Sequence, residues 1–149
     1  MTRKERLYIQ CKTFIDNRLK TLQNAINEIK NALLFETKST AGDKHETGRA
    51  MLQLEREKLG QQLDEMQKTK DLLARIDPKK VSDIICLGSL VYTEQLNYFI
   101  SISAGELIDN NNKFYAISPN TPIAKLLLSK CKGDVIEFRG EKNIIINIV

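Results

Sequence analysis

Apolar residues recur at steps of three or four through the first half of the chain, which is the spacing of a coiled-coil helix. A second run of apolar residues follows with a period of seven. The pattern predicts two amphipathic helices of about 30 residues, each about 45 Å long. The first set comprises Tyr8, Cys11, Ile15, Leu19, Leu22, Ile26, Ile29 and Leu33. The second set comprises Leu52, Leu59, Leu63, Met66 and Leu73, and Arg56 and Lys70 interrupt it.

The segment between the two predicted helices, roughly Thr37 to Gly42, is short and rich in residues that form turns. A short connection favours an antiparallel hairpin within one chain. The alternative is a parallel dimer in which each helix pairs with its own copy. Because a hairpin buries its own apolar seam, we expect a monomer.

The second half of the chain changes to short runs of β-branched and aromatic residues, which are typical of strands. Asp109–Asn112 is a loop by composition, and residues 139–142 look like a hairpin turn. Thr121 and Pro122 predict the start of one short helix, which Gly133 follows as a stop signal. The predicted fold class is therefore α+β, with a small antiparallel sheet packed on one helix. The predicted strands are Leu90–Thr93, Tyr98–Ile102, Val135–Phe138 and Ile144–Ile148.

The change in composition falls close to Pro78, because no proline precedes that residue. We therefore expect two modules. Residues 1–77 form the coiled-coil hairpin, with an acidic tip near residues 42–46. Residues 78–149 form the sheet domain.

Charge and cysteine content narrow the classes of function. The net charge of +4 is spread along the chain, with 15 basic against 12 acidic residues in 1–77 and 8 against 7 in 78–149. A dedicated DNA-binding domain is usually more basic. Three widely separated cysteines argue against a disulfide framework and a zinc site and favour the cytoplasm. We expect Cys86 and Cys131 to be small buried groups. No apolar run is long enough to span a membrane.

The acidic tip is the segment Gly42–Glu46, in which Asp43 and Glu46 stand three residues apart. One interpretation is a capping box, in which Asp43 caps the second helix and Glu46 reaches back. The other is chemical. Two carboxylates hold Mg²⁺ weakly alone, but a partner that supplies further ligands could complete a two-metal site for phosphodiester hydrolysis.

Four segments together resemble the bacterial Gre transcript-cleavage factors. The tip Gly42–Glu46 is similar to the tip of that family. Ile117–Leu128 resembles its Ser-Pro-Ile-Ala segment, and Lys130–Ile136 its Lys-x-x-Gly-Asp-x-Val segment. Leu87–Val91 resembles the strand that enters the family's second domain. The likeness covers nearly the whole chain, and the second-domain segments are its most specific part.

The resemblance implies an N-terminal coiled coil and a C-terminal domain like that of FK506-binding proteins. It implies that bacterial RNA polymerase is the partner and that the coiled coil enters the polymerase secondary channel. Asp43 and Glu46 would there support a Mg²⁺ ion shared with the polymerase, beside the 3′ end of the nascent RNA. The chain would hold no cofactor alone and would not be an enzyme alone. It would stimulate the polymerase to cut backtracked RNA.

After the tip the sequence departs from the family, which commonly continues Asn-Ala-Glu-Tyr. Here the residues are Thr47, Gly48, Arg49 and Ala50, so a basic residue replaces an acid. Lys44, His45 and Arg49 are candidates for contacts with RNA phosphate. The departure leaves open a regulator that occupies the channel without cleavage. A coiled-coil scaffold unrelated to polymerase is a third hypothesis.

Overall fold

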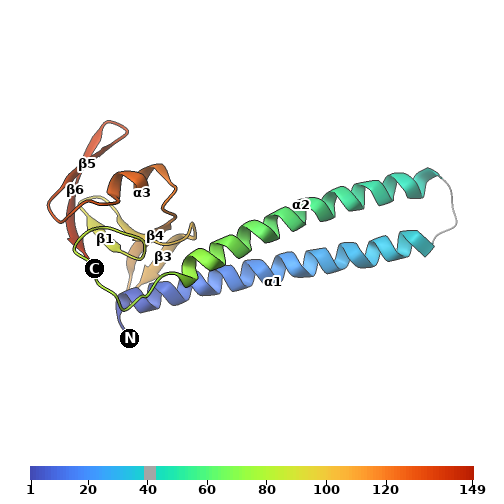
Figure 1. Ribbon diagram of the computed structural model, residues 1–149, viewed down its shortest axis with the longest axis horizontal. Helices are drawn as coiled ribbons and strands as arrows, with labels where there is room; N and C mark the ends of the chain where they lie inside the picture. The colour runs from blue at the N-terminus through green and yellow to red at the C-terminus, as the bar shows by residue number, and fades with distance from the viewer. Residues whose placement is uncertain (39–42) are drawn as a thin grey trace. The chain divides into compact units, whose positions relative to one another are not determined.

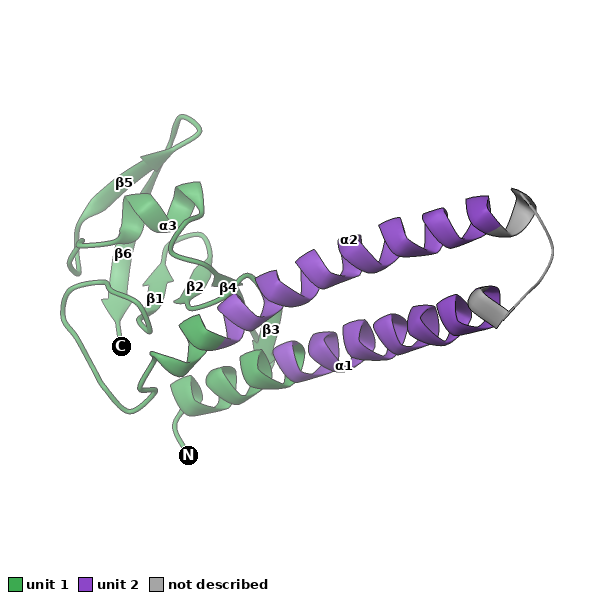
Figure 2. Ribbon diagram, turned by 45° about the vertical axis from the view of Figure 1, so that its right-hand side comes forward, with its two compact units in different colours: residues 1–14, 71–149 green, residues 15–70 purple. Residues whose placement is uncertain are grey.

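The computed structural model describes residues 1–38 and 43–149, and the side chains of residues 37, 38 and 43–45 are not described. The chain divides into two compact units, one of residues 1–14 with 71–149 and one of residues 15–70 (Figure 2). The division cuts both long helices, so residues 1–14 and 71–77 belong to the unit with the sheet. The expected module boundary after residue 77, which follows composition, stays a prediction.

Two long helices run antiparallel through residues 15–70, α1 (Arg3–Lys38) and α2 (Asp43–Ala74) (Figure 1). Their predicted seam is confirmed. Leu22 and Ile26 are buried in it, whereas the interrupting residues Arg56 and Lys70 are exposed. Helix α1 extends through Lys38, so the predicted connection starts later than Thr37, and its remaining residues 39–42 lie outside the described residues. No helix in the described part of the chain is long and apolar enough to cross a membrane.

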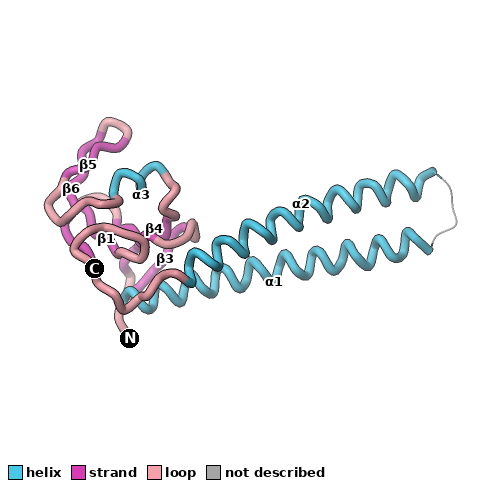
Figure 3. The backbone as a smooth tube through the Cα atoms, viewed as in Figure 1, coloured by secondary structure: helices cyan, strands magenta, loops and turns pink. Residues whose placement is uncertain are grey.

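The other unit contains a six-stranded sheet in the order β3-β4-β2-β1-β6-β5. Its strands are drawn in magenta in Figure 3. The α+β class is confirmed, with two long helices followed by a sheet and one short helix. Neighbouring strands are antiparallel except β2 and β4, which run parallel among the described residues. The elements are β1 (Leu90–Thr93), β2 (Asn97–Ile100), β3 (Gly105–Asp109), β4 (Asn112–Ile117), α3 (Pro122–Leu127), β5 (Val135–Phe138) and β6 (Glu141–Ile148).

Two hairpins in this sheet have two-residue turns. Asn110 and Asn111 join β3 to β4 with φ of 48° and 65°, and Arg139 and Gly140 join β5 to β6 with φ of 54° and 81°. Positive φ at both central residues is the type I′ turn, whose twist suits a hairpin. The hairpin predicted near residue 139 is confirmed. The segment Asp109–Asn112, expected to be a loop, is instead a tight turn between two strands that the sequence pattern had not indicated.

Helix α3 starts as predicted. The Thr121 hydroxyl accepts a hydrogen bond from the Ala124 amide at 3.3 Å, and Pro122 occupies the first turn. Ala124 and Leu127 then pack into one core with Ile100, Ile136 and other apolar residues of the sheet. The helix ends at Leu127, and Ser129 follows with a φ of 70°, so the turn that terminates it precedes Gly133.

The start of α1 is fixed by a buried carboxylate. Asp109, whose side chain is 5% exposed, accepts from Arg3 Nε at 2.9 Å and from Arg6 Nε at 2.6 Å. Arg6 Nη2 donates to the same carboxylate at 3.1 Å, which makes a bidentate fork. The Arg3 guanidinium also lies 5.2 Å from the centre of the Phe114 ring and donates to the Tyr92 hydroxyl. The first turns of α1 are thus bound to the β3–β4 hairpin.

Lys4 makes a second link at the same place. Its side chain is buried, and its Nζ donates to Lys80 O at 2.7 Å and to Val149 O at 3.0 Å. Burial lowers the pKa of this ammonium group, while Cys86 and Asp77 partly oppose that effect. The first turn of α1 therefore also contacts the segment after α2 and the residue after β6.

We predict that Asp109→Asn weakens the sheet unit at neutral pH but not in strong acid. Hydrogen bonds from Arg6 and Arg3 lower the pKa of Asp109 from 3.8 to about 2. A carboxyl whose pKa falls on folding stabilises above its unfolded pKa, and this contribution disappears as pH falls toward 2. The urea midpoint of the variant should therefore lie below that of the wild type at pH 7 and converge with it near pH 2.

All four tyrosines, at positions 8, 92, 98 and 115, lie in the sheet unit, so the tyrosine band of the near-ultraviolet circular dichroism reports on that unit. Glu106→Gln is the matched control, because Glu106 is an exposed carboxylate on the same strand, 3.9 Å from Lys113. A loss at pH 7 that is equal for both variants would contradict the role assigned to Asp109.

Candidate functional site

The two tip acids belong to the first turn of α2, because that helix begins at Asp43. Residues three apart on a helix are neighbours on its surface, so the backbone places Asp43 and Glu46 on one face. The Glu46 side chain is exposed. The side chains of Asp43, Lys44 and His45 lie outside the described residues, so the cap and the ligands expected there stay predictions. The positive end of the helix dipole favours both carboxylates at this position.

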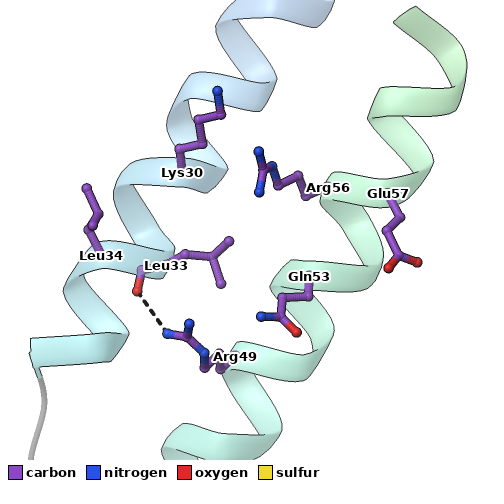
Figure 4. A pocket seen from close by; sticks show the side chains of 7 residues that line it. All are labelled: Lys30, Leu33, Leu34, Arg49, Gln53, Arg56 and Glu57. Carbon is purple, nitrogen blue, oxygen red and sulfur yellow. Dashed lines mark hydrogen bonds between the residues drawn. The ribbon is translucent and has the colours of Figure 1, made fainter. Parts of the chain in front are cut away.

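The residues after the tip turn toward α1. Arg49 is partly buried, and its Nη1 donates to the Leu33 carbonyl oxygen at 3.4 Å (Figure 4). Leu33 lies in the last turns of α1, where the negative end of the helix dipole favours a cation. Gly48 is close to the same helix, since a Cβ atom there would lie 3.9 Å from Glu36 Oε1. Arg49 therefore links the two helices through this hydrogen bond.

A groove of about 540 Å³ opens beside Arg49, between α1 and α2. Lys30 of α1 and Arg49 and Arg56 of α2 line it, with Glu57 as the acidic member (Figure 4). Leu33, Leu34 and Gln53 complete the lining. Three cations against one carboxylate make this groove suitable for an anion such as a phosphodiester.

Of the three RNA-contact candidates, the structure places Arg49 in this groove, while the side chains of Lys44 and His45 are not described. Lys30 and Arg56 were missed as site residues. The only signal for Arg56 was that a basic residue interrupts the apolar seam. Lys30 gave no signal, because its position opposite Arg56 depends on the register of the two helices.

No group of three or more histidine, cysteine, aspartate or glutamate side chains comes together to hold a metal ion among the described residues. Carboxylate oxygens are the donors that Mg²⁺ prefers, so Asp43 and Glu46 suit that ion chemically. Mg²⁺ is usually bound through one or two carboxylates with water and substrate phosphate. The two tip acids could therefore supply part of a site.

The cysteines differ from one another in exposure. Cys86 and Cys131 were expected to be buried, but both are exposed. Both lie outside the six strands, and Cys131 pairs with Ile84 in an isolated bridge. Cys11 is fully buried on α1, with its Sγ 3.7 Å from Ser101 Oγ. Burial raises the pKa of the Cys11 thiol to about 11.

We predict that two of the three thiols react quickly with Ellman's reagent in the folded protein at pH 8. At that pH roughly 0.1% of a thiol with a pKa near 11 is thiolate, and the thiolate is the reactive form. Cys11 should react only after unfolding in urea. Cys11→Ser should leave the two fast thiols unchanged, whereas a fast reaction of Cys11 in the folded protein would contradict its burial.

Comparison with known proteins gave matches only among solved structures. No protein-family model and no curated protein matches this chain. One similar structure is "Crystal structure of GreA factor homolog 1 (Gfh1) protein of Thermus thermophilus", at 21% identity and a TM-score of 0.35, covering 95% of this chain and 94% of that one. Another, "Structure of the transcription factor Gfh1", has 20% identity and a TM-score of 0.35, covering 95% and 92%. These values carry no conclusion about activity.

Proposed function

We propose that this chain is a Gre-like factor that binds bacterial RNA polymerase and brings Asp43 and Glu46 to the polymerase active centre. The observation that carries the proposal is the position of the two acids, three residues apart in the first turn of α2, where an antiparallel pair of helices ends. The second-domain segments Ile117–Leu128 and Lys130–Ile136, which resemble the Gre family, support it independently.

In this proposal Asp43 and Glu46 would hold a Mg²⁺ ion together with ligands of the polymerase and the RNA. The ion supplies charge stabilisation and lowers the pKa of a bound water. The ion would thereby favour hydrolysis of the phosphodiester, in which the water oxygen bonds to phosphorus while the bond to the 3′ oxygen of the upstream nucleotide breaks and the water proton passes to that oxygen. The acids do no cutting alone, because two carboxylates hold Mg²⁺ weakly. The chain is then a cofactor of the polymerase rather than a free enzyme.

The cationic groove supports a role near RNA. Lys30, Arg49 and Arg56 line it within a few turns of Glu46. Phosphate contacts of this kind hold a nucleic acid without reading its sequence. We propose that they position the 3′ segment of a backtracked transcript, together with Lys44 and His45.

A second candidate is a regulator that occupies the channel without promoting cleavage. Arg49 favours it, because a cation that contacts Leu33 stands where the family commonly has an acid. A coiled-coil scaffold unrelated to polymerase is a third candidate. The cationic groove gives it no support. For all three we expect a monomer, since Leu22 and Ile26 are buried within one chain. We also expect a cytoplasmic location, because three widely separated cysteines suit a reducing compartment.

We predict that the wild-type chain stimulates transcript cleavage by a backtracked polymerase of the same organism, and that Asp43→Asn/Glu46→Gln does not. Both amides are nearly isosteric with the acids but are poor ligands for Mg²⁺, so the cleavage rate should fall at least about tenfold. The measurement follows the shortening of an end-labelled RNA in a stalled complex at fixed Mg²⁺.

The matched control is Glu55→Gln/Asp64→Asn, which removes two exposed carboxylates from the same helix and should cleave as the wild type does. Equal rates for the wild type and the tip variant would refute the role of the acids. Co-migration with polymerase without cleavage would select the non-cleaving regulator. If the chain does not co-migrate with polymerase, only the scaffold hypothesis remains.

A further inference from the structure

The sheet unit has a pocket at the start of α1 that neither the tip nor the cationic groove uses. Its volume is about 460 Å³, and its lining comes from α1, the segment after α2, strand β1 and the residue after β6. Four cationic side chains line it, those of Arg3, Lys4, Arg6 and Lys79. No acidic side chain of the described residues belongs to the lining. The pocket is therefore suited to an anion.

The carboxylates around this pocket have partners of their own. Asp109 pairs with Arg3 and Arg6 from a buried position. Glu5 accepts from an amide at the start of α1 at 2.7 Å, and Asp77 accepts from an amide in the segment after α2 at 3.0 Å. Four lining cations less the one carboxylate that pairs with them leave a net charge of +3.

Lys4 is the buried member of the lining, with an exposed fraction of 4%. Its Nζ donates to the carbonyl oxygens of Lys80 and Val149. An ammonium group has three N–H donors, so one of them has no acceptor among the described residues. Lys4 also forms no ion pair with an acidic side chain in the described part of the chain. A buried charge without a counter-charge costs free energy, which an anion in the pocket would recover.

The lining offers further hydrogen-bond donors. The Tyr92 hydroxyl accepts from Arg3 Nη1 at 3.3 Å, and its own proton has no acceptor in the described part of the chain. Arg3 uses two of its five N–H donors, one toward Tyr92 and one toward Asp109. Lys79 is exposed, and its ammonium forms no ion pair among the described residues. Several charged donors in one pocket match the oxygens of a phosphoryl group.

We propose that this pocket binds a phosphomonoester with a small apolar body. A net charge of +3 favours a dianion over a carboxylate, and a phosphomonoester carries a charge of about −1.5 to −2 at neutral pH. Pro78 and Val81 also line the pocket, and Val81 is 65% exposed, so the apolar body can cover them. The proposal does not depend on binding to polymerase.

The test compares phenyl phosphate with phenyl sulfate, which has nearly the same shape but a single negative charge. Each compound is titrated into the full-length ¹⁵N-labelled protein at pH 7.5, and amide shifts are followed. Phenyl phosphate should shift Lys79, Val81 and Tyr92 with saturation and bind at least about tenfold more tightly than phenyl sulfate. Inorganic phosphate should shift the same amides and bind about three- to tenfold more weakly than phenyl phosphate, because it has no apolar body.

A tripeptide with a central phosphotyrosine identifies the source of the phosphoryl group. If the peptide binds as tightly as phenyl phosphate, the ligand is a modified side chain of a polypeptide. If only phenyl phosphate binds, the ligand is a free small molecule.

Two lysine variants connect the binding to this pocket. Lys79→Ala should weaken phenyl phosphate about three- to tenfold, since one cation of the lining is lost. Lys80→Ala removes the same charge from an exposed neighbour whose side chain does not line the pocket, and it is the matched control. A carboxylate at Val149 would compete for the same cations, so a protein with two glycines added after Val149 should bind at least as tightly.

Three results would overturn the proposal. One is equal affinity for phenyl phosphate and phenyl sulfate, and another is an equal loss in the two lysine variants. The third is the absence of saturating shifts at Lys79 and Val81.

Discussion

The sheet unit depends on the ion pairs that the Asp109 carboxylate forms with Arg3 and Arg6. This carboxylate accepts hydrogen bonds from the guanidinium groups of Arg3 and Arg6, and its side chain is almost fully shielded from solvent. Asp109 is the last residue of β3, and its carboxylate holds the first turns of α1, where Leu7 and Cys11 are fully buried. Because removal of one member of a buried ion pair leaves the others unpaired, this contact has no simple substitute.

The local elements followed from the sequence where a short-range pattern specifies them. The seam of α1 and α2 came from heptad spacing, and the start of α3 came from Thr121 and Pro122, whose capping bond spans three residues. The role of Asp109 could not be predicted, because its partners lie 103 and 106 residues away. Asn110 and Asn111 were recognised as turn formers, but the strands on either side were missed although their pairing is local. Cys86 and Cys131 are exposed because they lie outside the strands, and an apolar run around a cysteine does not show this.

The candidate site also combines features that a local pattern specifies with features that depend on contacts between distant residues. The spacing of Asp43 and Glu46 is a local property and could be predicted, whereas the groove of Lys30, Arg49 and Arg56 required the register of two helices. The segments that resemble the Gre family have local structural roles. Ser118 and Thr121 form the cap of α3, and Asp134 Oδ2 accepts from the Cys131 amide beside Gly133, whose φ is 90°. These residues stabilise local structure and say nothing about activity. The proposed activity therefore rests on Asp43 and Glu46 at the tip.

The central claim is that the end of the hairpin reaches the RNA inside the polymerase, and photo-cross-linking tests it most directly. A benzophenone amino acid is placed at Ala50, an exposed position one helical turn after Glu46, and at Asp64 as a control. In backtracked complexes with labelled RNA, the account predicts a cross-link from position 50 to the 3′ segment of the transcript and none from position 64. Binding of the protein to polymerase without any RNA cross-link from position 50 would contradict it.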